Sequence, residues 1–178
     1  TSSLVAVEVQ PTRPSRLVNI SVLGDLAPND QPITIGAVLG GEGTFGGTPL
    51  AFRAIGPSLA QFEVNEALSD PLLSLFDGNR TIATNDNWGN TQVLKNVFAR
   101  VGAFGMISPT SRDAAVFIPA QKTGALTIQS VSQLVEGGKV LVELYHAAQR
   151  ESLSTSTPRI INLSVLKKLK PTELLSVG

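Results

Sequence analysis

The chain contains no cysteine, and its 178 residues include only one histidine, one tryptophan, one tyrosine and one methionine. The lack of cysteine excludes disulfides, thiolate metal sites and cysteine nucleophiles. Neither sign of charge is in excess, because 14 basic residues balance 14 acidic ones. No apolar run approaches the roughly 20 residues that a membrane-spanning helix needs. We therefore expect no nucleic-acid partner and no insertion into a membrane.

The chain is rich in glycine and proline, and its side chains alternate as in β-strands. Its 16 glycines and 11 prolines divide it into short segments, and 42% of its residues are hydrophobic. Within these segments apolar residues recur at every second position, which places one set of side chains on a buried face. The pattern predicts an all-β protein, an antiparallel β-sandwich of jelly-roll or immunoglobulin-like type with one or two short helices.

The alternation also locates the elements, and one segment changes to a helical period. Apolar residues between 93 and 101 recur at helical spacing after the potential caps Asn90 and Thr91, so a short helix is expected there. A second helical turn is expected at 58–62, after Pro57. The expected strands are 4–9, 16–23, 33–39, 50–55, 72–77, 81–84, 114–118, 125–131, 140–146, 159–166 and 174–177.

The beginning of the chain is repeated at its end. Segment 16–23, RLVNISVL, returns at 159–166 as RIINLSVL, an offset of 143 (159 − 16). Segment 33–36 returns at 175–178 with an offset of 142 (175 − 33). Self-similarity at so long a period indicates an array of whole domains, so the chain reads as one repeat unit with the edges of its two neighbours.

The repeat divides the chain into four parts. We expect residues 1–15 to form an N-terminal strand followed by a proline-containing linker, and residues 16–147 to form the β-sandwich domain. Residues 148–158 are a Ser/Thr-rich linker without periodicity. Residues 159–178 form an extending strand segment of the kind that is donated to a partner.

The second copy needs a surface to cover its apolar face. The domain already has residues 17–22 for that position, and a strand left in water forfeits roughly 1.5–3 kcal/mol for each large side chain it could have buried. We expect the segment to add to the sheet edge of the next subunit, giving a head-to-tail filament or surface layer of identical copies. The predicted subunit interface is Arg159, Ile160, Ile161, Asn162, Leu163, Ser164, Val165 and Leu166.

An ordered series of short motifs runs along the domain. They are RLVNIS (16–21), RAIGPSL (53–59), LFDG (75–78), IATNDNW (82–88), VGAF (101–104), SRDAA (111–115) and VELY (142–145). This series resembles a β-sandwich repeat of large secreted bacterial surface proteins. The stretch from LFDG to NDNW is also similar to the corresponding hairpin of prepeptidase-type C-terminal domains. Both resemblances imply a secreted, extracellular protein of the cell surface, and neither implies an enzyme.

Oxygen-bearing side chains gather around residues 77–87. They are Asp77, Asn79, Asn85, Asp86 and Asn87, and hard oxygen donors are the ligands that Ca²⁺ takes. A hairpin would bring the two loops that carry them near one another. The alternative is turn chemistry, because Asp-Gly and Asn-Asp-Asn favour tight turns. No other cofactor is expected.

The single tryptophan supports a second functional reading. Trp88 could be a platform on which a sugar stacks, or a plug at one end of the sandwich. With the candidate calcium ligands it suggests a carbohydrate- or Ca²⁺-dependent adhesive module of a tandem-repeat secreted protein. This is the alternative to the strand-addition hypothesis.

The histidine and the remaining charged residues do not form a catalytic motif. His146 lies at a strand end, and no motif places a serine or an aspartate to work with it. Arg53, Asp70, Arg112 and Asp113 are charged residues within apolar motifs, where a partly buried ion pair or loop-bracing hydrogen bonds would explain them. We therefore expect a protein that is not an enzyme.

Overall fold

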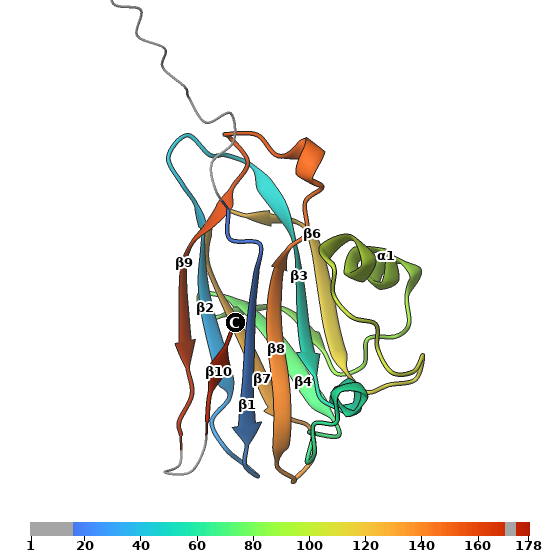
Figure 1. The fold of residues 1–178 in the computed structure, drawn as a ribbon. Coiled ribbons are helices and arrows are strands. Elements are labelled where there is room, and N and C mark those ends of the chain that lie inside the picture. Colours follow the sequence, from blue (N-terminus) through green and yellow to red (C-terminus); the bar gives the residue numbers. More distant parts are fainter. Residues whose placement is uncertain (1–15, 170–173) are drawn as a thin grey trace, which may run out of the picture.

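The protein is a sandwich of two antiparallel sheets with five strands each (Figure 1). The structure is a computed structural model and describes residues 16–169 and 174–178. The predicted all-β sandwich is confirmed. The strand expected at 4–9 lies outside the described residues.

The two sheets draw their strands from both halves of the chain. Sheet A has the order β10-β1-β8-β3-β6, with β10 (Ser176–Val177), β1 (Asn19–Leu26), β8 (Gly138–His146), β3 (Gly47–Ile55) and β6 (Ala114–Lys122). Sheet B has the order β5-β4-β7-β2-β9, with β5 (Arg80–Asn85), β4 (Pro71–Asp77), β7 (Gly124–Ser132), β2 (Ile33–Gly40) and β9 (Arg159–Leu166).

The alternation seen in the sequence produces the core. In β1 and β2 every second side chain is buried, and these side chains point between the sheets. Val22, Ile35 and Ile128 are fully buried there. Each such side chain stabilises the fold by roughly 1.5–3 kcal/mol through removal of apolar surface from water.

The predicted helix is present as α1 (Gln92–Val101), beside β6 on the outer side of sheet A (Figure 1). The Thr91 side chain accepts a hydrogen bond from the amide of Leu94 and so caps the first turn. The last turn ends at Gly102, whose φ of 71° is a left-handed conformation that glycine adopts without strain. A 3-10 helix, η1 (Pro57–Phe62), occupies the second predicted position.

A short 3-10 helix, η2 (Arg150–Ser152), follows β8. Within the described ranges, no helix has the length and apolar character needed to cross a membrane.

Candidate functional site

Next to the C-terminal strands, one side of the sandwich consists of β1 in sheet A and β2 in sheet B, and we name these two strands the acceptor edge. The C-terminal segment, residues 159–178, covers both strands with its described parts. Its β9 pairs with β2, and its β10 pairs with β1. Figure 1 shows β9 and β10 along this edge. One segment thus completes both sheets.

The segment attaches mainly through its main chain and one row of side chains. Ile160 is buried, while Leu163 and Val165 are partly buried against the core. Ile161 and Leu166 point outward and are 52% and 72% exposed. The alternation predicted for this strand is therefore present, and its apolar row faces the core of its own chain.

This placement corrects one premise of the sequence analysis. Segments 17–22 and 159–166 were expected to compete for one structural position, but β1 pairs with β8 in sheet A, whereas β9 pairs with β2 in sheet B. The two copies therefore occupy different positions, and the C-terminal strand lies on the sandwich instead of extending from it. Local alternation identifies a strand and its buried face, but not the sheet it joins.

One ion pair of the C-terminal segment has no counterpart in the first copy of the repeat. The Lys167 ammonium lies 2.6 Å from a carboxylate oxygen of Asp30, and the lysine side chain is fully buried. The hydrogen bond from Lys167 is the main cause that lowers the pKa of Asp30 below its ordinary value. In the first copy the equivalent position, 167 − 143, is Gly24. The second copy has thus acquired an anchor that the first cannot form.

The predicted linker 148–158 is folded across the end of the sandwich. Arg16 donates hydrogen bonds to the carbonyl oxygens of Ser154, Thr157 and Pro158, at 2.6, 3.0 and 3.1 Å. The amide of Phe45 donates to the Ser156 carbonyl. The connector is therefore held by the chain that enters β1 and by the loop after β2.

His146 lies beneath this connector. Its Nε2 is 2.9 Å from Thr48 Oγ1 and 3.2 Å from the Pro158 carbonyl oxygen. Burial is the main cause that lowers the pKa of this histidine below 6.5, and the charge of Arg16 acts in the same direction. The histidine joins β8 to the residue that precedes β9, which is a bracing role.

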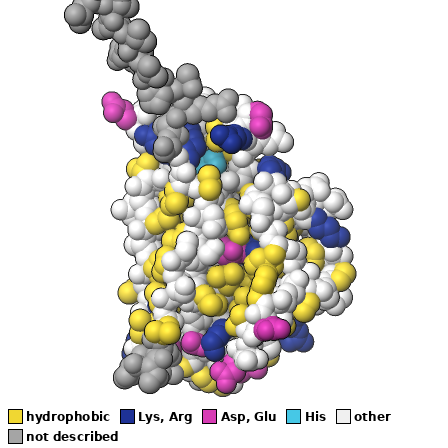
Figure 2. Space-filling model, viewed as in Figure 1, with side chains coloured by type: hydrophobic (Ala, Val, Ile, Leu, Met, Phe, Trp, Pro, Cys, Tyr) yellow, Lys and Arg dark blue, Asp and Glu magenta, His cyan; other side chains and the backbone are white. Residues whose placement is uncertain are grey.

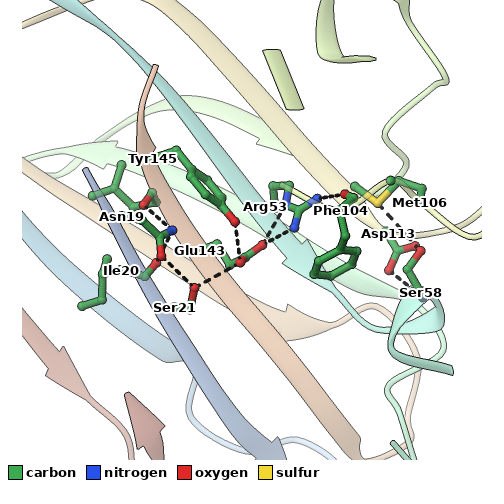
Figure 3. A network of polar contacts seen from close by, with 12 residues as sticks. Asn19, Ile20, Ser21, Arg53, Ser58, Phe104, Met106, Asp113, Glu143 and Tyr145 are labelled. Atoms are coloured by element: carbon green, nitrogen blue, oxygen red, sulfur yellow. Dashed lines mark hydrogen bonds and ion pairs between the residues drawn. The ribbon is translucent and has the colours of Figure 1, made fainter. Parts of the chain in front are cut away.

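A polar network crosses the outer face of sheet A beside the acceptor edge (Figure 3). Glu143 Oε1 accepts hydrogen bonds from Ser21 at 3.1 Å and from the Tyr145 hydroxyl at 2.7 Å. Glu143 Oε2 pairs with Arg53, whose Nε and Nη2 atoms lie at 2.7 and 2.5 Å. Hydrophobic side chains gather over the middle of this face (Figure 2). The network ties β1, β8 and β3 together.

Aromatic rings surround the arginine of this network. The Arg53 guanidinium carbon lies 4.3 Å from the ring centre of Phe104, 5.0 Å from that of Phe98 and 5.7 Å from that of Tyr145. Arg53 also donates to the Phe104 carbonyl at 2.6 Å. Burial, followed by the charge of Glu143, raises the pKa of Tyr145. The buried ion pair expected around Arg53 is present, and its partner is Glu143.

Asp113 is also fully buried, and it braces a loop as expected. One carboxylate oxygen accepts from the amides of Gly56 at 2.8 Å and Ser58 at 3.2 Å. The other accepts from the hydroxyls of Ser58 and Ser111. Asp113 thus holds the turn between β3 and η1. Outside this group, Arg112 forms an ion pair with Asp70 at 3.2 Å.

The candidate calcium ligands fall into two separate groups. Asp77 and Asn79 lie at the β4–β5 turn, where Asp77 pairs with Arg80. The other group follows the far end of β5, because Asn85 lies opposite Leu73 in the β4–β5 pairing. At about 3.3 Å per residue the strand separates them by roughly 16 Å. The hairpin does not bring the two groups together as the sequence analysis assumed.

The amide of Asn85 takes part in the fold. Its oxygen accepts from the amide of Ala115 at 2.8 Å, and its nitrogen donates to the carbonyl of Asn87 at the same distance. Among the described residues, no three His, Cys, Asp or Glu side chains gather as a metal site would require. Ca²⁺ binding at Asp86 and Asn87 remains a prediction.

Trp88 packs between α1 and β6. Its side chain is 5% exposed, and its ring lies 6.1 Å from that of Phe98. Leu94 and Ala115 belong to the same buried cluster. A ring so deeply buried fits the plug that the sequence suggested better than it fits a platform for sugar stacking.

Sequence reasoning missed three parts of this arrangement. The acceptor edge, the Lys167–Asp30 pair and the role of Glu143 were not predicted. The repeat contained a signal for the second, because Lys167 stands where the first copy has Gly24, directly after the matching segment 159–166. The only sequence signal for the role of Glu143 was its position in β8, where the alternation places its charged side chain on the outer face.

Comparison with protein-family models, with curated proteins and with solved structures finds no match to this chain.

Proposed function

We propose that the protein is an extracellular structural module that joins to further copies of itself by β-strand addition. The C-terminal segment is the donor, and the acceptor edge of a neighbouring copy receives it. The observation that carries this proposal is that one segment completes the edges of both sheets at once. An extended segment that adds main-chain hydrogen bonds to a sheet edge is a general mode of protein recognition.

Transfer of the segment to a neighbour preserves its strand pairings and its ion pair with Asp30. The Thr34–Leu166 and Val22–Val177 pairings, and the Lys167–Asp30 ion pair, form equally well between two chains. Domain swapping of this kind costs little because no new interface is required. Donor and acceptor are different surfaces, so successive transfers build a head-to-tail chain.

The connector sets the distance over which transfer operates. Residues 148–158 comprise 11 residues (158 − 147), which span at most about 40 Å when fully extended. Release requires loss of the hydrogen bonds from Arg16 to the connector carbonyls. The same bonds favour the unswapped state and so limit assembly at low concentration.

The secreted, cell-surface location belongs to the same proposal. The motif series between residues 16 and 145 supports it through its resemblance to a repeat of secreted bacterial surface proteins.

A glycan-binding role is the second candidate. A surface pocket of about 460 Å³ lies beside Trp88 and is also lined by Asn90, Lys95 and Ser108. The indole Nε1 of Trp88 is buried without a hydrogen-bond partner among the described residues. Calorimetric titration with a glycan panel tests this candidate, with Lys95→Ala as the variant; absence of heat in both proteins contradicts it.

The strand-addition proposal is tested with the paired variant Thr34→Cys/Leu166→Cys, since the natural chain has no cysteine. The two residues lie opposite each other in the β2–β9 pairing, at a separation that suits a disulfide. After refolding at high concentration and oxidation, we expect a ladder of disulfide-linked oligomers on a non-reducing gel. Crosslinking confined to the monomer would contradict transfer.

The matched control is Ser74→Cys/Gln129→Cys. These residues lie opposite each other in the interior β4–β7 pairing, which belongs to the body of the domain. We expect this pair to crosslink within the monomer under the same conditions. A ladder from the control would indicate general unfolding and exchange instead of donation of the C-terminal segment.

A further inference from the structure

The C-terminal segment and the acceptor edge are related by a pseudo-twofold axis. Adding 143 to residues 19–23 of β1 gives residues 162–166 of β9, and subtracting 142 from residues 176–177 of β10 gives residues 34–35 of β2. The pairing of Val22 with Val177 in sheet A then becomes a pairing of Val165 with Ile35. Sheet B contains that pair.

The next pair repeats the relation. Leu23 lies opposite Ser176, and the same conversion gives Leu166 opposite Thr34, which the structure also contains. The symmetry therefore extends to the register of the strands and not only to their sequences. A shift of a single residue would turn the opposite faces toward the core and break the relation.

A serine–glycine pair occupies the equivalent position in sheet A and in sheet B. Ser21 and Gly178 exchange two main-chain hydrogen bonds of 2.9 Å. Their counterparts, Ser164 and Gly36, lie opposite each other in sheet B. A Cβ atom on Gly36 would lie 2.5 Å from Ser164 Oγ, so the serine occupies the space that glycine leaves open.

We infer that the acceptor edge is self-complementary and that the C-terminal segment stands in for the edge of a second copy of this chain. When the segments of two chains are displaced, β1 of each chain pairs with β2 of the other. The expected register places Val22 opposite Ile35 and Leu23 opposite Thr34 of the second copy.

The side chains of the edge suit this pairing. Ile20 and Val22 of β1 and Ile35 and Ala37 of β2 all point into the core, so the inferred register aligns apolar rows from the two copies. The outward residues at the centre of the pairing, including Ser21, carry no charge. Neither row places like charges opposite one another, which would destabilise the contact.

The inferred assembly differs from strand transfer in its symmetry. Each copy offers the same surface, so the contact is isologous and closes with two chains. Sheet A of one copy continues into sheet B of the other on both sides of the axis. The inference thus uses the same acceptor edge as strand addition but a different occupant, and either can fail without the other.

The ion pair of Lys167 explains why the single chain covers its own edge. A second copy would present Gly24 at that position and would leave Asp30 without this partner. The covalent connection also gives the segment a high effective concentration at the edge. Weakening the segment should therefore shift the chain toward the symmetric pair.

The paired variant Leu23→Cys/Thr34→Cys in the full chain tests the inference. Within one chain these residues lie on the outer faces of opposite sheets, which are stacked about 10 Å apart, so they cannot form a disulfide. In the symmetric pair each cysteine lies opposite its counterpart. We expect a disulfide-linked dimer that does not extend into a ladder.

Displacement of the segment should raise the yield of this dimer several-fold. Val165→Asp places a charge on the row that faces the core, and Lys167→Ala removes the anchor without burying a charge. An excess of a synthetic peptide of residues 159–178 should reduce the yield again. Circular dichroism checks that each chain remains folded, and Lys167→Ala decides the outcome if Val165→Asp unfolds.

Two further chains are the controls. Each control places a disulfide between the C-terminal segment and the acceptor edge of the same chain. The two paired variants are Leu23→Cys/Ser176→Cys and Thr34→Cys/Leu166→Cys. Oxidised monomers of either variant should form no symmetric dimer. Crosslinks between Thr34 and Leu166 of different chains report strand transfer, whereas those between Leu23 and Thr34 report symmetric pairing. Absence of the Leu23–Thr34 crosslink in every background overturns the inference.

Discussion

At the scale of single residues, Arg53 is a buried charge that the fold must compensate. Its side chain is fully buried, and Glu143, its partner, is 4% exposed. Desolvation of two charges is costly, and it is offset here by two contacts to Glu143, a carbonyl acceptor and three aromatic rings. A group so completely enclosed depends on every one of its partners.

Removal of the arginine alone should be severe. Arg53→Ala leaves the Glu143 carboxylate buried without its cation, and breaking a buried pair in this way costs roughly 3–5 kcal/mol. Urea denaturation followed by tryptophan fluorescence measures the change in the free energy of unfolding. The double variant Arg53→Met/Glu143→Leu should be more stable than Arg53→Ala, because it leaves no unpaired charge. A double variant that is less stable than Arg53→Ala would contradict this account.

His146 should make the stability of the protein depend on pH. Burial lowers its pKa in the folded state below the ordinary value of 6.5, so the unfolded chain binds a proton more readily than the folded one. Stability should therefore fall as the pH drops below about 6.5, until the lower folded pKa is passed. Chemical denaturation at a series of pH values between about 7 and 5 measures this dependence.

The variant His146→Gln retains a polar side chain and removes the titration. We expect its free energy of unfolding to vary less over the same pH range. Equal slopes for the variant and the natural protein would assign the pH dependence to other groups.

At the scale of elements, the junction between β3 and η1 passes very close to the backbone of Leu68, in the connection that leads to β4. Gly56 lies there, and its amide donates to Asp113. A Cβ atom at this position would lie 2.0 Å from the Leu68 carbonyl oxygen, which belongs to the backbone and cannot rotate away. The glycine is required by close approach, since its φ of −119° is accessible to any residue.

Gly56→Ala should therefore destabilise the protein by roughly 1–3 kcal/mol, the usual cost of overpacking. Gly105→Ala is the matched control, because a Cβ atom there would meet nothing within 4 Å. That variant should lie within about 0.5 kcal/mol of the natural protein. Thermal denaturation of the two variants compares them directly, and equal melting temperatures would contradict the close contact.

At the scale of the whole molecule, local patterns predicted elements well and their partners poorly. Alternation located β9 at its observed bounds, and the helical period after the candidate caps Asn90 and Thr91 located α1, whose cap is Thr91. Neither pattern contains information on pairing between residues distant in sequence. The assignment of β9 to the edge of β2, more than 100 residues away, therefore could not be read from its own sequence.

The candidate site was predicted only in part, because local patterns do not show which strands pair. The repeat drew attention to residues 159–166 as a strand that needs a sheet edge, and it has one. It did not show that the edge of the same chain provides it, or that Lys167 strengthens the contact. The candidate calcium ligands do not lie together, because β5 is long enough to separate the two ends of its hairpin.

The order of strands in the sheets has a consequence for the time course of folding. β1 pairs with β8, and β2 pairs with β7 and β9, so β1 and β2 leave the ribosome before partners that are synthesised about 100 residues later. At roughly 5–20 residues per second this delay lasts several seconds or more. Residues 159–178 emerge after β1, β2, β7 and β8. Two nascent chains on neighbouring ribosomes would thus meet while each still lacks the segment that covers its edge.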